Sequence, residues 1–140
     1  MGNFVHQRLV QFADTDLAGI VHFARYLLYM EEAEHAFLRS RGLSVHEERP
    51  DGTLCWPRVQ ATCDYHSPAK FEATLDIAVT VAEFAAKAAT YRFDIACDGR
   101  KVATGKIVAV CCRWAGSGAN RTLAAVEIPD DIRRKLAGAE

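Results

Sequence analysis

The sequence predicts an α+β domain in which an antiparallel sheet packs against one long helix. Three observations support this fold class. Apolar residues recur at three- and four-residue spacing between about His22 and Arg41, as in an amphipathic helix. Apolar and polar residues alternate in several later segments, as in half-buried antiparallel strands. The chain has 140 residues, close to the usual size of one domain, so we expect a single domain over residues 1–140.

The N-terminal part of the chain is expected to form a strand, a loop and then the long helix. The strand covers Phe4 to Phe12, where both faces mix apolar and polar side chains. Residues 13–19 combine short oxygen-bearing side chains with a glycine, which is typical of a turn that leads into a helix. The helix is expected to end at Gly42, because glycine is favoured just past a helix C-terminus. Residues 43–57 are assigned no element.

The rest of the chain is expected to form strands followed by a short helix. The four strands cover residues 58–65, 75–82, 91–97 and 102–114. Asp98-Gly99 predicts a tight hairpin turn between the last two, because this dipeptide readily adopts positive φ angles. The last strand is apolar at nearly every position, so we expect a second subunit to pair there. Acids at the start and bases at the end of residues 129–136 predict a short helix.

Charge and composition exclude several classes of function. Seventeen Lys and Arg against eighteen Asp and Glu give a formal charge of -1, which provides no field favouring nucleic acid or anionic membrane. No apolar run approaches the roughly 18 residues of a membrane span, and the first residues lack the pattern of a signal peptide. We therefore expect a cytoplasmic protein without a nucleic-acid partner. The five cysteines lack CxxC spacing, which predicts reduced thiols rather than disulfides or a zinc site.

Asp16 is the leading catalytic candidate. It stands between the first strand and the predicted helix start, where backbone N–H groups lack partners and the helix dipole is positive. A carboxylate beside such donors suits acyl transfer, because the donors stabilise the oxygen that gains charge while the acid attacks the carbonyl carbon or activates water. From spacing alone, the commoner role is structural, with Asp14, Thr15 or Asp16 capping the helix.

A resemblance to a known family is carried by residues 14–21, which read DTDLAGIV, and by Tyr26 and Glu31. This pattern resembles the signature of the 4-hydroxybenzoyl-CoA thioesterase family, and the likeness continues through residues 63–68 and over nearly the whole chain. It implies a hotdog fold, a curved antiparallel sheet of about five strands wrapped around one long central helix. It also implies a homodimer or homotetramer that hydrolyses acyl-CoA thioesters at sites between subunits.

The resemblance assigns roles to individual residues. It implies that Asp16 is the nucleophile or general base, and that backbone groups of Phe23 and Gly19 form the hole that polarises the thioester carbonyl. Glu31 is implied as a helix residue near the site. No metal and no cofactor are expected, because a thiolate leaves readily without a Lewis acid and CoA is part of the substrate.

The family pattern suggests further contacts with the substrate. His22 is a candidate, although relatives of the acyl-CoA thioesterase type carry the histidine one position later, a turn of about 100° around a helix. Lys87 lies between two alternating strands, at a position similar to a CoA-contacting lysine of the family. Lys87, Arg58 and Arg113 are therefore the candidates for binding the CoA phosphates, as exposed point charges.

Two other functions stay open. A hotdog hydratase or dehydratase acting on acyl thioesters would need a histidine paired with an acid to move protons at carbon. A non-catalytic acyl-CoA-binding module would use Asp16 only as a cap. Calcium binding is rejected, because Arg25 stands where a calcium loop beginning at Asp14 requires a glutamate. The sequence leaves open the acyl group, whether aromatic, medium-chain or naphthoyl-type.

Overall fold

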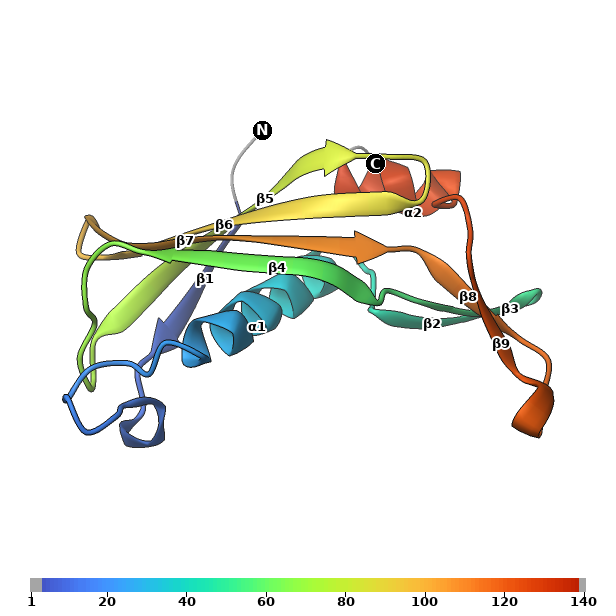
Figure 1. Ribbon diagram of the computed structural model, residues 1–140. Helices are drawn as coiled ribbons and strands as arrows, with labels where there is room; N and C mark the ends of the chain where they lie inside the picture. The colour runs from blue at the N-terminus through green and yellow to red at the C-terminus, as the bar shows by residue number, and fades with distance from the viewer. Residues whose placement is uncertain (1–3, 139–140) are drawn as a thin grey trace.

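The computed structural model describes residues 4–138 and contains an antiparallel five-stranded sheet that arches over a long helix (Figure 1). The sheet order is β1-β5-β6-β7-β4. Its strands are β1 (Phe4–Leu9), β4 (Arg58–Tyr65), β5 (Thr74–Phe84), β6 (Ala88–Cys97) and β7 (Arg100–Val110), and the helix is α1 (Arg25–Ser40). The predicted α+β class and a main sheet of five strands are confirmed, although the first and last predicted strands have other bounds.

Helix α1 packs one face on the sheet and leaves the other uncovered within the chain. Tyr29, Met30 and Ala33 are fully buried, whereas Leu27 and Leu28 on the opposite side are exposed. Gly105 on β7 allows close packing here, because its missing side chain leaves room for the Met30 sulfur.

The ends of α1 show one success and one error of the sequence prediction. Gly42 adopts a φ of +71° as predicted, and the Leu43 N–H returns to the Leu38 carbonyl over 2.8 Å. The start is later than expected, at Arg25 rather than His22. The reason is that the His22 N–H bonds the Asp14 carbonyl, while the His22 ring accepts the Ala24 N–H.

A second sheet of four short strands extends from the end of the main sheet (Figure 1). Its order is β2-β3-β8-β9, with β2 (His46–Arg49), β3 (Gly52–Cys55), β8 (Cys112–Ala115) and β9 (Thr122–Ala125). The single strand predicted over residues 102–114 is therefore wrong. It divides at Cys111, whose N–H bonds the Lys87 carbonyl while the next residue begins to pair with β3.

The expected partner contact at this strand is also wrong. Strand β7 lies inside the sheet, paired with β6 on one side and β4 on the other, so its backbone groups are already used. The free edges of the main sheet are β1 and β4. The apolar character of β7 comes instead from packing against α1 through residues such as Val102, Ala103 and Ile107, which are all buried.

Three smaller features complete the fold. Asp98 and Gly99 both have positive φ, 49° and 79°, which confirms the predicted tight hairpin turn between β6 and β7. The C-terminal helix α2 (Asp130–Leu136) is also confirmed, with acids in its first turn and bases in its last. The first strand is shorter than expected, because residues 12–14 form a 3₁₀ turn, η1.

All five cysteines are free thiols, as expected. No helix among residues 4–138 has the length and apolar character needed to cross a membrane.

Candidate active site

The loop that carries Asp16 is a closed turn with its two ends held together. Thr15 pairs with Val21, and the Asp16 N–H donates to the Ile20 carbonyl over 2.9 Å. At the tip, the Gly19 N–H returns to the Asp16 carbonyl over 2.9 Å. Gly19 has a φ of +83°, a conformation that other residues adopt only at a cost. No atom of residues 4–138 lies within 4 Å of where its Cβ would stand, so this glycine is required by the turn conformation rather than by close packing.

The carboxylate of Asp16 is exposed and only partly engaged. Its Oδ1 accepts a hydrogen bond from the Ala18 N–H over 2.9 Å, an arrangement typical of an Asx turn. Within residues 4–138, the second oxygen accepts no hydrogen bond. None of Asp14, Thr15 and Asp16 caps α1, which begins only at Arg25, so that structural alternative is wrong.

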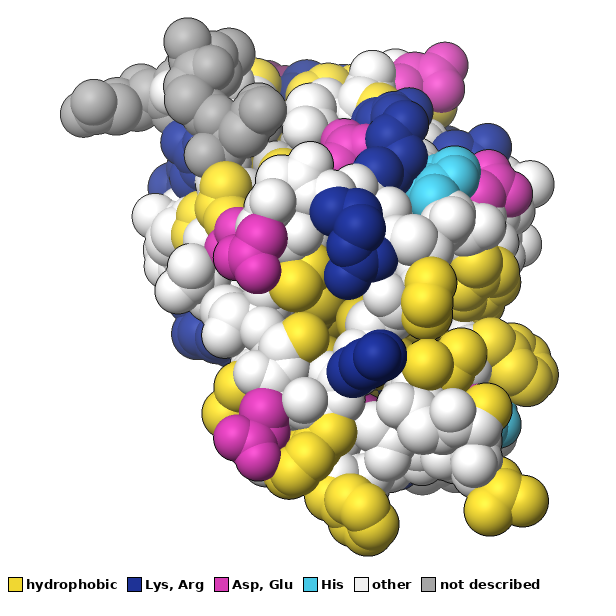
Figure 2. Space-filling view, turned by 90° about the vertical axis from the view of Figure 1, so that its left-hand side faces the viewer, with side chains coloured by type: hydrophobic (Ala, Val, Ile, Leu, Met, Phe, Trp, Pro, Cys, Tyr) yellow, Lys and Arg dark blue, Asp and Glu magenta, His cyan; other side chains and the backbone are white. Residues whose placement is uncertain are grey.

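Asp16 borders a cavity of about 430 Å³ at one end of the molecule. Its lining comes from the Asp16 loop, the start of α1 and the chain just after β4: Asp16, Ile20, Val21, Phe23, Tyr26, Tyr65, His66, Ser67 and Pro68. Figure 2 looks onto this end, and hydrophobic side chains gather on its lower part. Leu17 at the tip of the loop is fully exposed, and Phe12 packs edge-on against Phe71 nearby. The surroundings of Asp16 are therefore mostly apolar, which suits an apolar ligand with few polar contacts.

Phe23 offers a free backbone donor at this cavity. It lies two residues before α1, and within the described part of the chain its N–H finds no acceptor. The Tyr65 hydroxyl donates to the Phe23 carbonyl over 2.9 Å, which ties this peptide to the end of β4. The adjacent N-terminus of α1 adds a positive dipole. Asp16 and Phe23, which carries an unused N–H, thus line one cavity.

Two other aromatic residues, Tyr26 and His22, lie near the start of α1. Tyr26 is buried, and burial, with smaller contributions from Cys63 and Tyr65, raises its pKa to about 12, so its hydroxyl stays protonated and can donate a hydrogen bond. His22 does not line the cavity. Its ring stacks on Phe23 with centroids 4.7 Å apart.

The other predicted site residues lie elsewhere in the chain. Glu31 and Arg58 border a second cavity of about 490 Å³, together with His35, His46 and Trp56. The Arg58 guanidinium pairs with the buried Glu34 carboxylate and donates to the Trp56 carbonyl over 2.5 Å.

The other two predicted CoA contacts are also distant from Asp16. Lys87 is exposed in the turn between β5 and β6, and Arg113 on β8 pairs with Asp51 over 3.0 Å. In Figure 1 this turn and the Asp16 loop lie at opposite ends of the molecule. Within one chain, therefore, Glu31, Arg58, Lys87 and Arg113 are not brought together with Asp16.

Comparison with known proteins shows the family of the chain. A profile of the thioesterase-like superfamily matches residues 10–136. The chain belongs to the thioesterase-like superfamily. It is 35% identical over 86 residues to a 1,4-dihydroxy-2-naphthoyl-CoA hydrolase of Synechocystis, a match spanning 61% of this chain and 62% of the relative. A protein of the same name from Synechococcus elongatus is 28% identical over 112 residues, 79% of this chain and 82% of the relative.

Solved structures support the same thioesterase-like assignment. The fold superposes on a 1,4-dihydroxy-2-naphthoyl-CoA thioesterase from Synechocystis with a TM-score of 0.83 and 25% identity, covering 97% of this chain and 96% of the other. A 4-hydroxybenzoyl-CoA thioesterase matches in fold with a TM-score of 0.78 at 20% identity, covering 96% and 98% of the two chains. The predicted resemblance, the hotdog fold and the class of thioester hydrolase are confirmed at the level of the family.

The thioesterase-like chain brings residues to its cavity that the sequence reasoning did not name as site residues. These are Ile20, Val21, Tyr26, Tyr65, His66, Ser67 and Pro68. A signal was present, since Tyr65 ends the strand predicted over residues 58–65 and the next three residues follow it, and loops next to strands commonly carry functional residues. What the sequence did not show is that β4 runs so that its last residue meets the start of α1.

Proposed function

We propose that the protein hydrolyses an acyl-CoA thioester to a free acid and CoA, with Asp16 as the nucleophile or general base. The observation that carries the proposal is that two residues with unused polar groups line the same cavity: Asp16, whose second carboxylate oxygen accepts no hydrogen bond within residues 4–138, and Phe23, whose N–H has no acceptor there. The names of its relatives support CoA esters of hydroxylated aromatic acids as the first substrates to test.

The proposed chemistry needs only groups of the chain and water. As a general base, Asp16 takes a proton from water while the water oxygen attacks the carbonyl carbon, and the Phe23 N–H stabilises the resulting oxyanion. Collapse of this intermediate breaks the carbon–sulfur bond, and the proton held by Asp16 passes to the departing thiolate. As a nucleophile, the carboxylate itself attacks and expels the thiolate, and water then hydrolyses the mixed anhydride.

We further propose that the working unit is a homodimer in which two β4 edges pair antiparallel about a two-fold axis. Strand β4 has a free edge, and Val59 and Tyr65 on it are exposed, as are Leu27 and Leu28 on α1. Such an apolar edge is a ready surface for pairing with another strand.

This pairing would explain where the predicted site residues lie. Arg58 and Tyr65 begin and end β4, roughly 23 Å apart at about 3.3 Å per residue. In an antiparallel pair, the Arg58 end of one strand lies beside the Tyr65 end of the other. Glu31, Arg58 and Lys87 of one copy would then approach the Asp16 cavity of the other, where the two cations could meet the CoA phosphates.

The test is thiol release from a panel of aromatic and medium-chain acyl-CoAs. Asp16→Asn and Asp16→Ala should lower kcat by about 10²-fold or more, with unchanged folding by circular dichroism and unchanged size in gel filtration. Glu83→Gln, an exposed carboxylate change on β5 outside the cavity, is the control. Wild-type turnover in the Asp16 variants contradicts the proposal, and tight binding of acyl-CoA without thiol release favours a non-catalytic module.

Single turnover in ¹⁸O-water separates the two roles of Asp16. Label in the Asp16 carboxylate indicates a nucleophile whose anhydride is opened by water at the aspartyl carbon. Label only in the released acid excludes that route and leaves either a general base or attack of water on the acyl carbon of the anhydride.

One observation keeps the hydratase alternative in the test. His66 borders the same cavity as Asp16, which supplies the histidine and acid that such chemistry needs. Its ring contacts the Thr104 hydroxyl at 3.2 Å, and no hydrogen bond joins it to Asp16 within residues 4–138, so hydrolysis is the better supported reaction. Loss of an enoyl thioester's ultraviolet absorbance without thiol release would identify hydration.

A further inference from the structure

Asp14, two residues before the proposed catalytic residue, is a buried carboxylate that does not border the cavity. Its exposed fraction is 2%, and among residues 4–138 Glu34 is the one other buried acidic residue. Burying a carboxylate costs free energy unless charges and hydrogen bonds compensate. Its surroundings therefore indicate what Asp14 holds in place.

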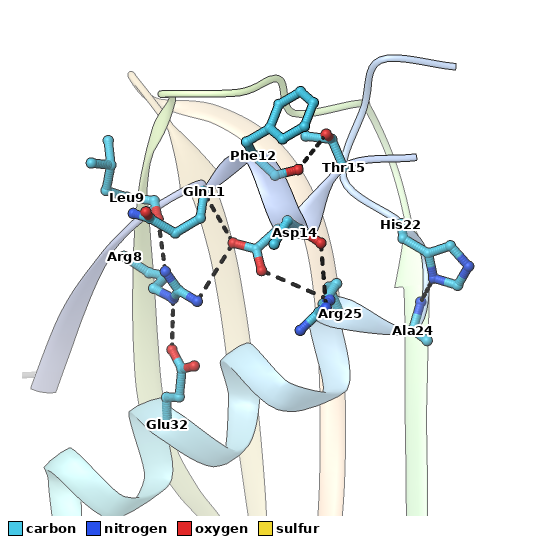
Figure 3. A network of polar contacts seen from close by, with 11 residues as sticks. Arg8, Leu9, Gln11, Phe12, Asp14, Thr15, His22, Ala24, Arg25 and Glu32 are labelled. Atoms are coloured by element: carbon cyan, nitrogen blue, oxygen red, sulfur yellow. Dashed lines mark hydrogen bonds and ion pairs between the residues drawn. The ribbon is translucent and has the colours of Figure 1, made fainter. Parts of the chain in front are cut away.

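The Asp14 carboxylate joins three parts of the chain (Figure 3). Its Oδ2 accepts the Gln11 N–H over 2.9 Å and lies 3.5 Å from the Arg8 guanidinium of β1. Its Oδ1 lies 3.8 Å from Nε of Arg25, the first residue of α1. Arg25 also donates to the Ala13 carbonyl over 3.3 Å. The start of the Asp16 loop is thereby attached both to the sheet and to the helix.

The backbone of Asp14 holds the other end of the same loop. Its carbonyl accepts the His22 N–H over 2.8 Å. Asp16 follows Asp14 by two residues, and Phe23 follows His22 directly. The proposed catalytic carboxylate and the proposed oxyanion donor therefore both depend on where Asp14 sits.

We propose that Asp14 is a positioning residue, whose contacts with Arg8, Arg25 and Gln11 fix the relative position of the Asp16 carboxylate and the Phe23 N–H. This inference rests on the proposed function of Asp16. A buried charge suits this role, because ion pairs and hydrogen bonds on opposite sides of the carboxylate fix one position of Asp14. Apolar packing alone would allow several positions. A displacement of about 1 Å between reacting groups can reduce turnover by about 10²-fold.

The test compares Asp14→Asn with a control that shares one partner. Asparagine keeps the shape and one acceptor oxygen for the Gln11 N–H but removes the charge between the two arginines. We expect kcat to fall about 10- to 100-fold with little change in KM. The control is Glu32→Gln, because Glu32 pairs with the same Arg8 over 2.8 Å without touching the loop. Its kcat should stay within twofold of the wild type.

Arg25→Gln keeps the proposal testable if Asp14→Asn folds poorly, because the Arg25 side chain is 40% exposed. We expect the same selective loss of kcat. The double variant should be no slower than Asp14→Asn alone, since both single changes remove the same ion pair between Asp14 and Arg25. The melting temperature and elution volume are measured for every variant. A lower melting temperature with kcat unchanged in both Asp14→Asn and Arg25→Gln overturns the proposal.

Failure of the proposed function gives a different result. If Asp16→Asn retains activity, Asp16 is not catalytic, whatever the Asp14 variants do. If Asp16→Asn is inactive while Asp14→Asn and Arg25→Gln match Glu32→Gln, the positioning role alone is refuted.

Discussion

Glu34 should make the stability of this protein fall as the pH rises from acid to neutral. The side chain is 1% exposed in the middle of α1, and burial raises its pKa from 4.5 to about 7, although Arg58 opposes the change. Between these two values the folded state keeps a proton that the unfolded chain has released. The free energy of unfolding therefore decreases as the pH rises through this range.

The size of the effect follows from the two pKa values. At about 1.4 kcal/mol for each pKa unit, the interval from 4.5 to about 7 corresponds to about 3 kcal/mol, lost between pH 4.5 and 8. The glutamine of Glu34→Gln cannot titrate. The free energy of unfolding of this variant should therefore fall by about 3 kcal/mol less than that of the wild type as the pH rises over the same interval.

Urea unfolding followed by circular dichroism at five pH values would measure both slopes. Glu127→Gln, a change of an exposed carboxylate in the segment before α2, is the matched control and should follow the wild-type curve. The comparison uses slopes because Glu34→Gln also alters the contact with Arg58 at every pH. Parallel curves for Glu34→Gln and the wild type would refute the reasoning.

Three other substitutions test packing and the site. Gly105→Ala should lower the free energy of unfolding by about 1–3 kcal/mol in urea titrations, because its Cβ would overlap Met30, and an unchanged midpoint would contradict that packing. Gly19→Ala should cost about 1–2 kcal/mol from its positive φ and slow thiol release, whereas normal stability and turnover would show that the turn tolerates a side chain. Tyr65→Phe removes the hydroxyl bonded to the Phe23 carbonyl and should lower kcat about 10-fold with a similar melting temperature; a changed KM at constant kcat would argue against this positioning.

The sequence predicted the parts of the fold that local chemistry determines. The Asp98-Gly99 turn and the Gly42 helix end depend on backbone angles that few residues adopt, so short motifs were enough. The division of the last long strand at Cys111 depends on pairing with β3, far away in the sequence. The late start of α1 was missed for a similar reason, since His22 and Phe23 continue the apolar spacing while Asp14 holds the backbone outside the helix.

The site, like the fold, combines residues that the local sequence could predict with residues that depend on the sheet topology. Asp16 and Phe23, both named from the sequence, line the same cavity because they belong to one short stretch of chain. The contributions of Tyr65 and His66 could not, since they depend on the direction of β4 in the sheet. The local pattern identified Asp14 only as a potential helix cap, and its contacts with Arg8 and Arg25 required the fold.

The cavity wall formed by Ser67 and Pro68 belongs to the connection between β4 and β5, whereas Asp16 stands on a separate loop. Under the proposed function, part of the wall that would select the acyl group and the carboxylate that would react with it therefore come from different segments of the chain. Ala69 and Lys70 pair with the Asp16 loop, through the Val21 N–H on the Ala69 carbonyl and the bridge between Ile20 and Lys70. Under the proposed function, an exchange confined to residues 66–68 should therefore change which acids are released without moving Asp16. Directed evolution of such an enzyme could begin with that graft.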